Sequence, residues 1–260
     1  MSHEALAIIR RELDVWHKAG RIATLWWRDD DAHAASPALK RLLKLCDAHS
    51  VPCCLAAIPA RIEDSLVHAL QNSPHAWVLQ HGFAHENHAS QGQGLGAWEL
   101  GLHRPLEAVL KELASGKKIL ETRFGQRFIP VVVPPWNRIE PALLKHFPDL
   151  GLIGLSAEED NQLVADAVRI VPAHADLLRW KGGTARFAGA MKVAGQLVGN
   201  LRARRTGTAE QNTPTGVLTH HLEMDEAAWD FMAALLKVTA THPASRWLPA
   251  PEVFTPEDVQ

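Results

Sequence analysis

Short apolar runs alternate with amphipathic stretches along almost the whole chain, and this alternation limits the possible folds most strongly. The apolar runs are short and bounded by polar or glycine-containing segments, which is typical of buried strands. Strands that alternate with helices predict a mostly parallel sheet covered by helices. We expect strands over residues 22–28, 53–58, 77–81, 128–133, 150–155, 168–172 and 216–219, and helices over 2–17, 62–72, 104–124, 141–147, 187–205 and 225–240, with one more helix opening at Ser36-Pro37.

Such strand–helix units can form either a closed barrel or a doubly wound open sheet, and the length of the chain and its motifs favour the barrel. The chain has 260 residues, 47% of them hydrophobic, and a barrel of alternating strands and helices typically needs about 250 residues. A dinucleotide-binding sheet is disfavoured because no Gly-x-Gly-x-x-Gly follows the first strand. We therefore expect an α/β fold, a TIM-barrel-like barrel of about seven parallel strands, in a single domain spanning residues 1–260.

The composition argues against several kinds of partner. The formal net charge is -2, which does not favour binding to nucleic acid or to an anionic membrane. No apolar segment is long enough to span a bilayer. Cys46, Cys53 and Cys54 are odd in number and include an adjacent pair, unlike a disulfide framework. With an N-terminal stretch that lacks the apolar core of a signal peptide, these features predict a cytoplasmic protein.

Two clusters of polar residues directly follow predicted strands. Asp29, Asp30 and Asp31 follow the first strand, and His81 and His85 stand where the third strand ends. Adjacent carboxylates repel one another unless a cation lies among them, and carboxylate and neutral imidazole are common zinc ligands. Each cluster alone could be a solvated turn or a surface loop. Their shared position at strand ends favours a site for a divalent metal ion.

Two further clusters occupy the same kind of position. The segment 134–138, Pro-Pro-Trp-Asn-Arg, follows the strand expected over 128–133, and Thr219-His220-His221 closes the strand expected over 216–219. In barrels of this type the catalytic residues lie at the C-terminal ends of the strands. If the barrel closes, four polar clusters therefore converge on one face.

In this set of motifs the chain resembles the polysaccharide deacetylases of carbohydrate esterase family 4. The matching segments run through most of the chain in the family's order: Asp30-Asp31, His81 to His85, Pro134-Pro135-Trp136 and Leu218-Thr219-His220-His221. The resemblance implies a distorted (β/α) barrel of about seven strands. It also implies one divalent metal ion, with zinc the first choice, and a hydrolase that removes acetyl groups.

The resemblance also implies roles for individual residues. The implied metal ligands are Asp31, His81 and His85. Asp30, the first member of the aspartate pair, would be the general base. The third aspartate leaves Asp29-Asp30 as a competing pair. With Asp30-Asp31 as the pair, however, Ala32 occupies the small-residue position that follows the pair in the family. We therefore prefer Asp30-Asp31.

The late motif offers two candidates for the general acid. Strand alternation sends only one of His220 and His221 into the barrel. The family spacing favours His221, and both residues stay candidates. Asp176 and Trp180 weakly resemble a further family motif, but we expect Trp180 to be an ordinary buried tryptophan.

The chain departs from the family at the third motif. An arginine usually stands two residues before the proline, and that position is Val132 here. Arg28 and Arg138 are the candidates to orient the base carboxylate instead. Four residues are candidates for contact with the substrate, with a core or loop-bracing role as the alternative for most of them: Trp136, Arg138, Asn87 and His88.

The function expected from these residues is metal-dependent hydrolysis of an N-acyl group on a small-molecule or saccharide substrate through an activated water. A related amidohydrolase acting on a cyclic or linear amide would use the same residues. A carbohydrate-binding barrel without activity is the third possibility, because the third motif is altered.

Overall fold

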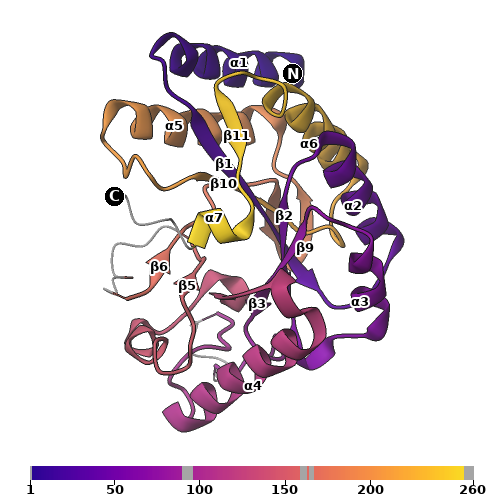
Figure 1. The fold of residues 1–260 in the computed structure, drawn as a ribbon, viewed down its shortest axis with the longest axis vertical. Coiled ribbons are helices and arrows are strands. Elements are labelled where there is room, and N and C mark those ends of the chain that lie inside the picture. The colour runs from indigo at the N-terminus through magenta and orange to yellow at the C-terminus, as the bar shows by residue number, and fades with distance from the viewer. Residues whose placement is uncertain (1, 90–95, 159–162, 164–166, 255–260) are drawn as a thin grey trace.

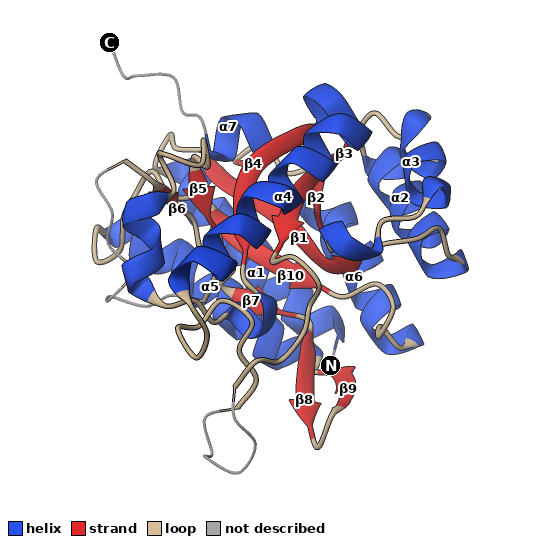
Figure 2. Cartoon of the chain, turned by 90° about the horizontal axis from the view of Figure 1, so that it is seen from below, coloured by secondary structure: helices blue, strands red, loops and turns tan. Residues whose placement is uncertain are grey.

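The structure is a computed structural model that describes residues 2–89, 96–158, 163 and 167–254. Its centre is a curled sheet in which every strand pairing is parallel, in the order β6-β5-β4-β3-β2-β1-β10-β7 (Figures 1 and 2). A short strand, β11, pairs with the start of β1. The strands are β1 (Ala23–Ala32), β2 (Cys53–Ala57), β3 (Ala76–His81), β4 (Phe128–Val133), β5 (Gly154–Leu155), β6 (Arg169–Ile170), β7 (Ala175–Asp176), β10 (Thr215–Thr219) and β11 (Ser245–Trp247).

The predicted distorted barrel is confirmed. The sheet order begins at β6 and ends at β7, so the described strands form an open barrel. The described strands other than β8 (Leu178–Lys181) and β9 (Thr184–Phe187) belong to this one sheet. That residues 1–260 form a single domain stays a prediction.

Helices surround the outer face of the curled sheet (Figure 1). The largest apolar cluster lies between this face and the helices, with side chains from both layers, for example Trp16 and Trp229 from helices and Trp27 from β1. The helices are α1 (Ser2–Lys18), α2 (Pro37–His49), α3 (Asp64–Gln71), α4 (Leu106–Phe124), α5 (Ala190–Thr206), α6 (Glu226–Thr239) and α7 (Ala250–Phe254). The helices of this layer each present an apolar stripe to the sheet, whereas the buried residues of α7 pack inside the barrel.

The predicted start of α2 is confirmed in detail. Ser36 is the N-cap, and its hydroxyl accepts a hydrogen bond from the backbone N–H of Leu39 at 3.0 Å. Pro37 takes the first helical position, where its missing N–H costs nothing. Among the described helices, none has the length and apolar character needed to cross a membrane.

A second apolar cluster fills the inside of the barrel. Strand alternation sends Trp26 into it, while Trp27 packs on the outer side. Val253 and Phe254 of α7 complete the cluster, and the Trp26 indole meets the Phe254 ring edge-on at 5.5 Å. The interior is therefore a packed apolar core that supports the strands, and the polar candidate site residues lie at the strand ends.

Several elements differ from the sequence prediction. β1 runs to Ala32 and includes the aspartates that we expected in a loop. Aspartate is a poor strand former, but here the aspartates are held by buried partners described below. The predicted strands over 150–155 and 168–172 shorten to β5 and β6, and the helix over 141–147 is a 3-10 helix, Pro141–His146. The antiparallel hairpin β8–β9 was not predicted.

Candidate metal centre and active site

Three potential metal ligands meet where β1 and β3 end. The Oδ1 atom of Asp31 lies 3.2 Å from Nε2 of His81 and 3.3 Å from Nε2 of His85. Within the described residues, these three side chains are the one cluster of His, Cys, Asp or Glu whose ligand atoms all lie within 4.8 Å of one another. Atoms bound at about 2.0–2.2 Å to a tetrahedral zinc ion stand roughly 3.3–3.6 Å apart. The spacing therefore fits one small divalent cation.

The hydrogen bond on the far side of His81 supports the same interpretation. Its Nδ1 lies 2.8 Å from the backbone oxygen of Val133, so this nitrogen carries the proton and donates. In the neutral ring, Nε2 then has a free lone pair directed at the Asp31 carboxylate. A metal-binding imidazole is usually fixed in this way by a carbonyl on its other nitrogen.

A bulge in β1 explains how adjacent aspartates reach one site. Asp29 pairs with Leu55 of β2, but Ala32 pairs with Ala57, so β1 has one extra residue in this interval. Asp31 has a positive φ of 71°. In a regular strand Asp30 and Asp31 would point to opposite faces, whereas a bulge redirects a side chain. The bulge thus allows Asp30 and Asp31 to serve the same site.

The electrostatics of two of the three candidate ligands, Asp31 and His85, favour the metal-binding forms. Burial raises the pKa of Asp31, but the hydrogen bond and charge of His81 and the charges of His85 and His220 hold it well below its usual range. Burial lowers the pKa of His85, and His81 lowers it further. Burial also lowers the pKa of His81, but Asp31 and Asp30 more than reverse this. A divalent cation would replace the proton that this carboxylate-rich setting favours on His81.

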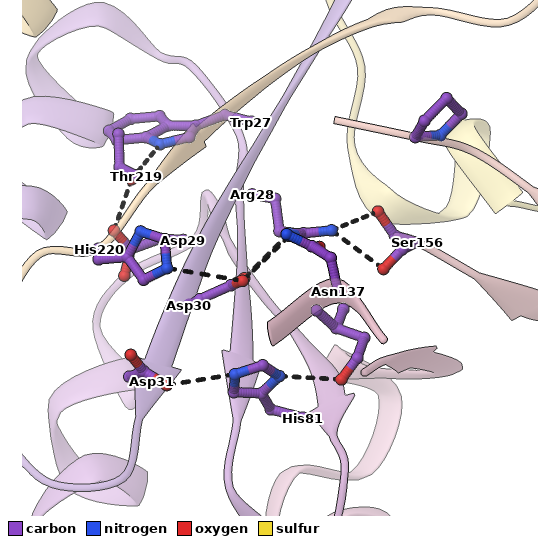
Figure 3. A network of polar contacts seen from close by, with 12 residues as sticks. Trp27, Arg28, Asp29, Asp30, Asp31, His81, Asn137, Ser156, Thr219 and His220 are labelled. Carbon is purple, nitrogen blue, oxygen red and sulfur yellow. Dashed lines mark hydrogen bonds and ion pairs between the residues drawn. The ribbon is translucent and has the colours of Figure 1, made fainter. Parts of the chain in front are cut away.

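Asp30 is held by Arg28, two residues earlier on the same face of β1. Nε of Arg28 lies 2.9 Å from Oδ1 of Asp30, and Nη2 donates to Oδ2 at 3.0 Å. The guanidinium also donates to Ser156 and, at 2.7 Å, to Oδ1 of Asn137 (Figure 3). Arg28 is fully buried and Asp30 is 4% exposed. A bidentate pair of this kind fixes the orientation of the carboxylate.

Arg28 therefore occupies the place that Arg138 could have taken. The guanidinium of Arg138 lies 5.8 Å from the ring of Trp98 instead. Val132, at the family's arginine position, packs in an outer apolar cluster, so its side chain points away from the barrel interior. Sequence reasoning placed Asn137 in a polar segment at a strand end but did not identify it as a partner of Arg28, and it missed Ser156, which belongs to no recognised motif.

The two late histidines separate as strand alternation requires. Nε2 of His220 lies 4.0 Å from Oδ2 of Asp30, next to the candidate metal ligands (Figure 3). His221 is 1% exposed, and its Nδ1 lies 2.5 Å from Oδ1 of Asp29. The geometry thus brings His220 to the site, although the family spacing favoured His221.

Asp29 belongs to a buried network behind the site. Its Oδ2 accepts hydrogen bonds from the hydroxyl of Thr219 at 2.5 Å and from the backbone N–H of His221 at 3.0 Å. Trp27 donates in turn to Thr219. Burial lowers the pKa of His221, but the charge and hydrogen bond of Asp29 raise it overall. With Asp29 fully buried, the alternative of a solvated acidic turn does not hold.

Aromatic side chains stand on two sides of the cluster. The Trp136 ring lies 4.5 Å from that of His85 and is 39% exposed. Trp180, on β8, meets His220 edge-on at 5.2 Å and is 48% exposed. The expectation that Trp180 is an ordinary buried tryptophan is wrong, because the unpredicted β8–β9 hairpin carries it to the rim of the site.

Asn87 and His88 lie in the loop after β3. The side-chain oxygen of Asn87 accepts hydrogen bonds from the backbone N–H groups of Ala89 and Trp98, each at 2.9 Å. The N–H of His88 donates to the backbone oxygen of Trp98 at 2.7 Å. These contacts brace the loop. Direct contact of either side chain with a substrate stays a prediction.

A polar cleft opens beside the site, on the side where the sheet does not close. Its volume is about 710 Å³. Asn137, which accepts a hydrogen bond from Arg28, lines this cleft together with Asp176, His174 and Asn200. Burial raises the pKa of Asp176, although the nearby His220 opposes this.

Comparison with known proteins adds a fold-level result. No family model and no curated protein matches the sequence. The structure, however, is similar to a peptidoglycan N-acetylglucosamine deacetylase bound to a hydroxybenzamide compound, with a TM-score of 0.58 and 16% identity over 90% of this chain and 89% of the other. It is also similar to a peptidoglycan deacetylase from Bacillus subtilis, with a TM-score of 0.53 and 13% identity over 89% and 90% of the two chains.

A third similar structure is a family 4 acetyl xylan esterase from Clostridium thermocellum with a cobalt ion, with a TM-score of 0.53 and 14% identity over 89% and 90% of the two chains. The chain has the fold of the polysaccharide deacetylases. Another structure with this fold is a mutant of a family 4 pseudoenzyme whose activity was restored, with a TM-score of 0.52. Activity on this fold therefore depends on the residues at the site, and the fold alone does not settle it.

Proposed function

We propose that this protein is a metal-dependent hydrolase that removes an acetyl or other N-acyl group from a saccharide. The observation that carries the proposal is the meeting of Asp31, His81 and His85 next to a carboxylate that is oriented by an arginine. These groups lie at or near the C-terminal ends of β1 and β3, which is where barrels of this type place catalytic residues.

Asp31, His81 and His85 would hold the metal ion, with zinc as the first choice for a set of two imidazoles and one carboxylate. When bound there, the ion would supply Lewis-acid polarisation of the acyl carbonyl and of a water molecule. The fixed proton on Nδ1 of His81 keeps its Nε2 available as a ligand.

Asp30 would act as the general base. It lies beside the ligands without belonging to the metal cluster, so its carboxylate is free to accept a proton from the attacking water. Arg28 positions that carboxylate through two contacts and is itself fixed by Ser156 and Asn137.

His220 would act as the general acid. Its Nε2 faces Asp30 at 4.0 Å, and the ring is partly covered by Trp180. An amine leaves only with a proton on its nitrogen, and an imidazole can supply this proton and recover it in each cycle. Trp136, exposed beside His85, would offer a flat apolar surface to a sugar ring.

An acetylated saccharide is the preferred substrate because the similar structures include peptidoglycan deacetylases and an acetyl xylan esterase. Hydrolysis of another linear or cyclic amide would use the same groups. A carbohydrate-binding protein without activity fits less well, since Asp31, His81 and His85 meet in one cluster and His220 faces Asp30 beside it. The three cysteines are unpaired and buried, which supports the proposal of a reducing, cytoplasmic location.

The test is release of acetate from N-acetylglucosamine oligomers. Protein loaded with zinc should release acetate, a chelator should stop the release, and added zinc should restore it. Asp31→Ala, which removes one ligand, should be inactive with or without zinc. Acetate release that is unaffected by chelator and by Asp31→Ala would refute the proposal.

A further inference from the structure

The loop that carries His85 is wrapped around a buried carboxylate. Glu99 is fully buried, and its side chain accepts hydrogen bonds from three backbone N–H groups of this loop. The distances are 3.1 Å from Phe83 to Oε2, and 2.7 Å from Ala84 and 3.5 Å from Glu86 to Oε1. A buried carboxylate is destabilising unless hydrogen-bond donors surround it. Here the backbone N–H groups of the loop are those donors, so the carboxylate and the loop conformation depend on each other.

The backbone of His85 has an unfavourable conformation that the contacts with Glu99 hold in place. Its φ is 57°, in the left-handed region that is unfavourable for a non-glycine residue. The N–H groups that Glu99 holds at Ala84 and Glu86 lie on either side of His85. Strained residues of this kind persist only where surrounding contacts fix them.

Gly82 shows how closely the loop fits around Glu99. It also has a positive φ, of 54°. A Cβ atom at this position would lie 1.8 Å from Oε2 of Glu99 and 2.7 Å from a side-chain atom of Pro135. Only glycine therefore lets the turn between His81 and His85 approach the carboxylate.

Contacts between the two arms of the loop bring Glu99 into place. The side-chain oxygen of Asn87 accepts from the N–H of Trp98, and the N–H of His88 donates to the oxygen of Trp98. Trp98 directly precedes Glu99, so these bonds place the glutamate beneath the turn.

We infer that Glu99 is a positioning residue for the metal centre: it holds the turn from Gly82 to Glu86 so that the His85 imidazole points at Asp31 before any ion binds. The inference rests on the metal site of the proposed function. Nothing in the sequence pattern marks Glu99, because it lies outside every motif and acts through backbone N–H groups, which almost any residue type can offer.

The experiment measures zinc affinity by competition with a chromogenic chelator for wild type, Glu99→Gln and Glu99→Ala. Removing a partner that orients a ligand typically weakens metal binding about 10- to 100-fold. Glu99→Ala should show the larger loss. Glu99→Gln should lie between it and wild type, because its one remaining oxygen can still accept from Ala84. The control is Glu12→Gln, which changes another buried glutamate, on α1 and paired with Arg205, and should leave zinc affinity unchanged.

Hydrogen exchange of the metal-free proteins provides a readout that needs no metal. The amides of Phe83 and Ala84 should lose protection in the Glu99 variants, while that of Leu79 in β3 should keep it. Folded Glu99 variants with wild-type zinc affinity and protected amides would overturn the inference and leave the proposed function intact. If wild type itself bound no zinc, the proposed metal site would fail, and the exchange data would still decide whether Glu99 anchors the turn.

Discussion

Asp29, Asp30 and Asp31 are identical side chains in consecutive positions, and their surroundings separate them. Asp29 is tied to Thr219 and His221, Asp30 is held by Arg28, and Asp31 faces His81 and His85. The sequence could predict that a triple aspartate at a strand end needs a cation. It could not show which carboxylate contacts which partner. The partners depend on the bulge in β1, and no residue type in the sequence predicts that bulge.

Replacing Asp30 with asparagine tests its role as base. Asp30→Asn should bind zinc as wild type does, since Asp30 is outside the ligand set, but an amide cannot accept a proton at neutral pH. We expect kcat to fall by roughly 10²–10⁴-fold, measured together with the zinc content. A variant that keeps near-normal turnover would remove Asp30 from the mechanism.

The two histidines should respond differently to substitution. His220→Ala should lower kcat by a similar factor of about 10²–10⁴ and leave stability nearly unchanged. His221→Ala leaves the buried Asp29 carboxylate without its main partner, so it should cost about 3–5 kcal/mol of unfolding free energy. Urea unfolding and initial rates for both variants give the comparison. Equal, small effects on the rate would argue that neither residue is the acid.

At the level of secondary structure, apolar periodicity and capping residues predicted the strand–helix order and the N-terminus of α2. They also placed the candidate metal ligands at strand ends. The length of β1 and the β8–β9 hairpin could not be predicted in this way. β1 continues through three aspartates because tertiary contacts override their low strand propensity. The hairpin has little apolar pattern, with Arg179, Trp180 and Lys181 all exposed, so Trp180 was misassigned to the core.

Strand β1 carries both Asp30, the proposed base, and Arg28, which contacts both of its carboxylate oxygens. Arg28→Lys keeps the charge but loses the planar fork that contacts both oxygens of Asp30. We expect kcat to drop about 10-fold or more while zinc content stays constant. Arg138→Lys, on a guanidinium that lies by Trp98, is the matched control and should change kcat less. If the two variants lose activity equally, Arg28 has no special role in orienting Asp30.

For the molecule as a whole, the sequence predicted the barrel but not its opening between β6 and β7. β7 has only two residues, which leave almost no periodic signal, and it matches no predicted strand. β5 and β6 are also two residues long, shorter than the strands expected over 150–155 and 168–172. The polar cleft next to the site follows from this opening, since its lining comes from α5 and the segments near β7.

Global stability should depend on pH through His174, whose Nδ1 accepts the N–H of Gly216 on β10 at 2.8 Å. Burial, with a contribution from Arg204, lowers the pKa of His174 from 6.5 to about 4. Between these values the unfolded chain binds more protons than the folded chain, so stability falls as the pH drops through this window. His174→Asn keeps an acceptor without this titration. It should lose about 2–3 kcal/mol less than wild type between pH 7 and pH 4.5, measured by urea unfolding. Parallel pH curves for the two proteins would refute this assignment.

The central claim is that Asp31, His81 and His85, at or just after the ends of strands β1 and β3, hold a catalytic divalent ion. It is tested most directly by a crystal structure of the zinc-loaded protein with anomalous data at the zinc edge. The account predicts a single ion about 2.0–2.2 Å from a carboxylate oxygen of Asp31, Nε2 of His81 and Nε2 of His85. Asp30 should stay paired with Arg28 and outside the ligand set. An ion bound elsewhere, or bound through Asp29 or Asp30 in place of Asp31, would contradict the account.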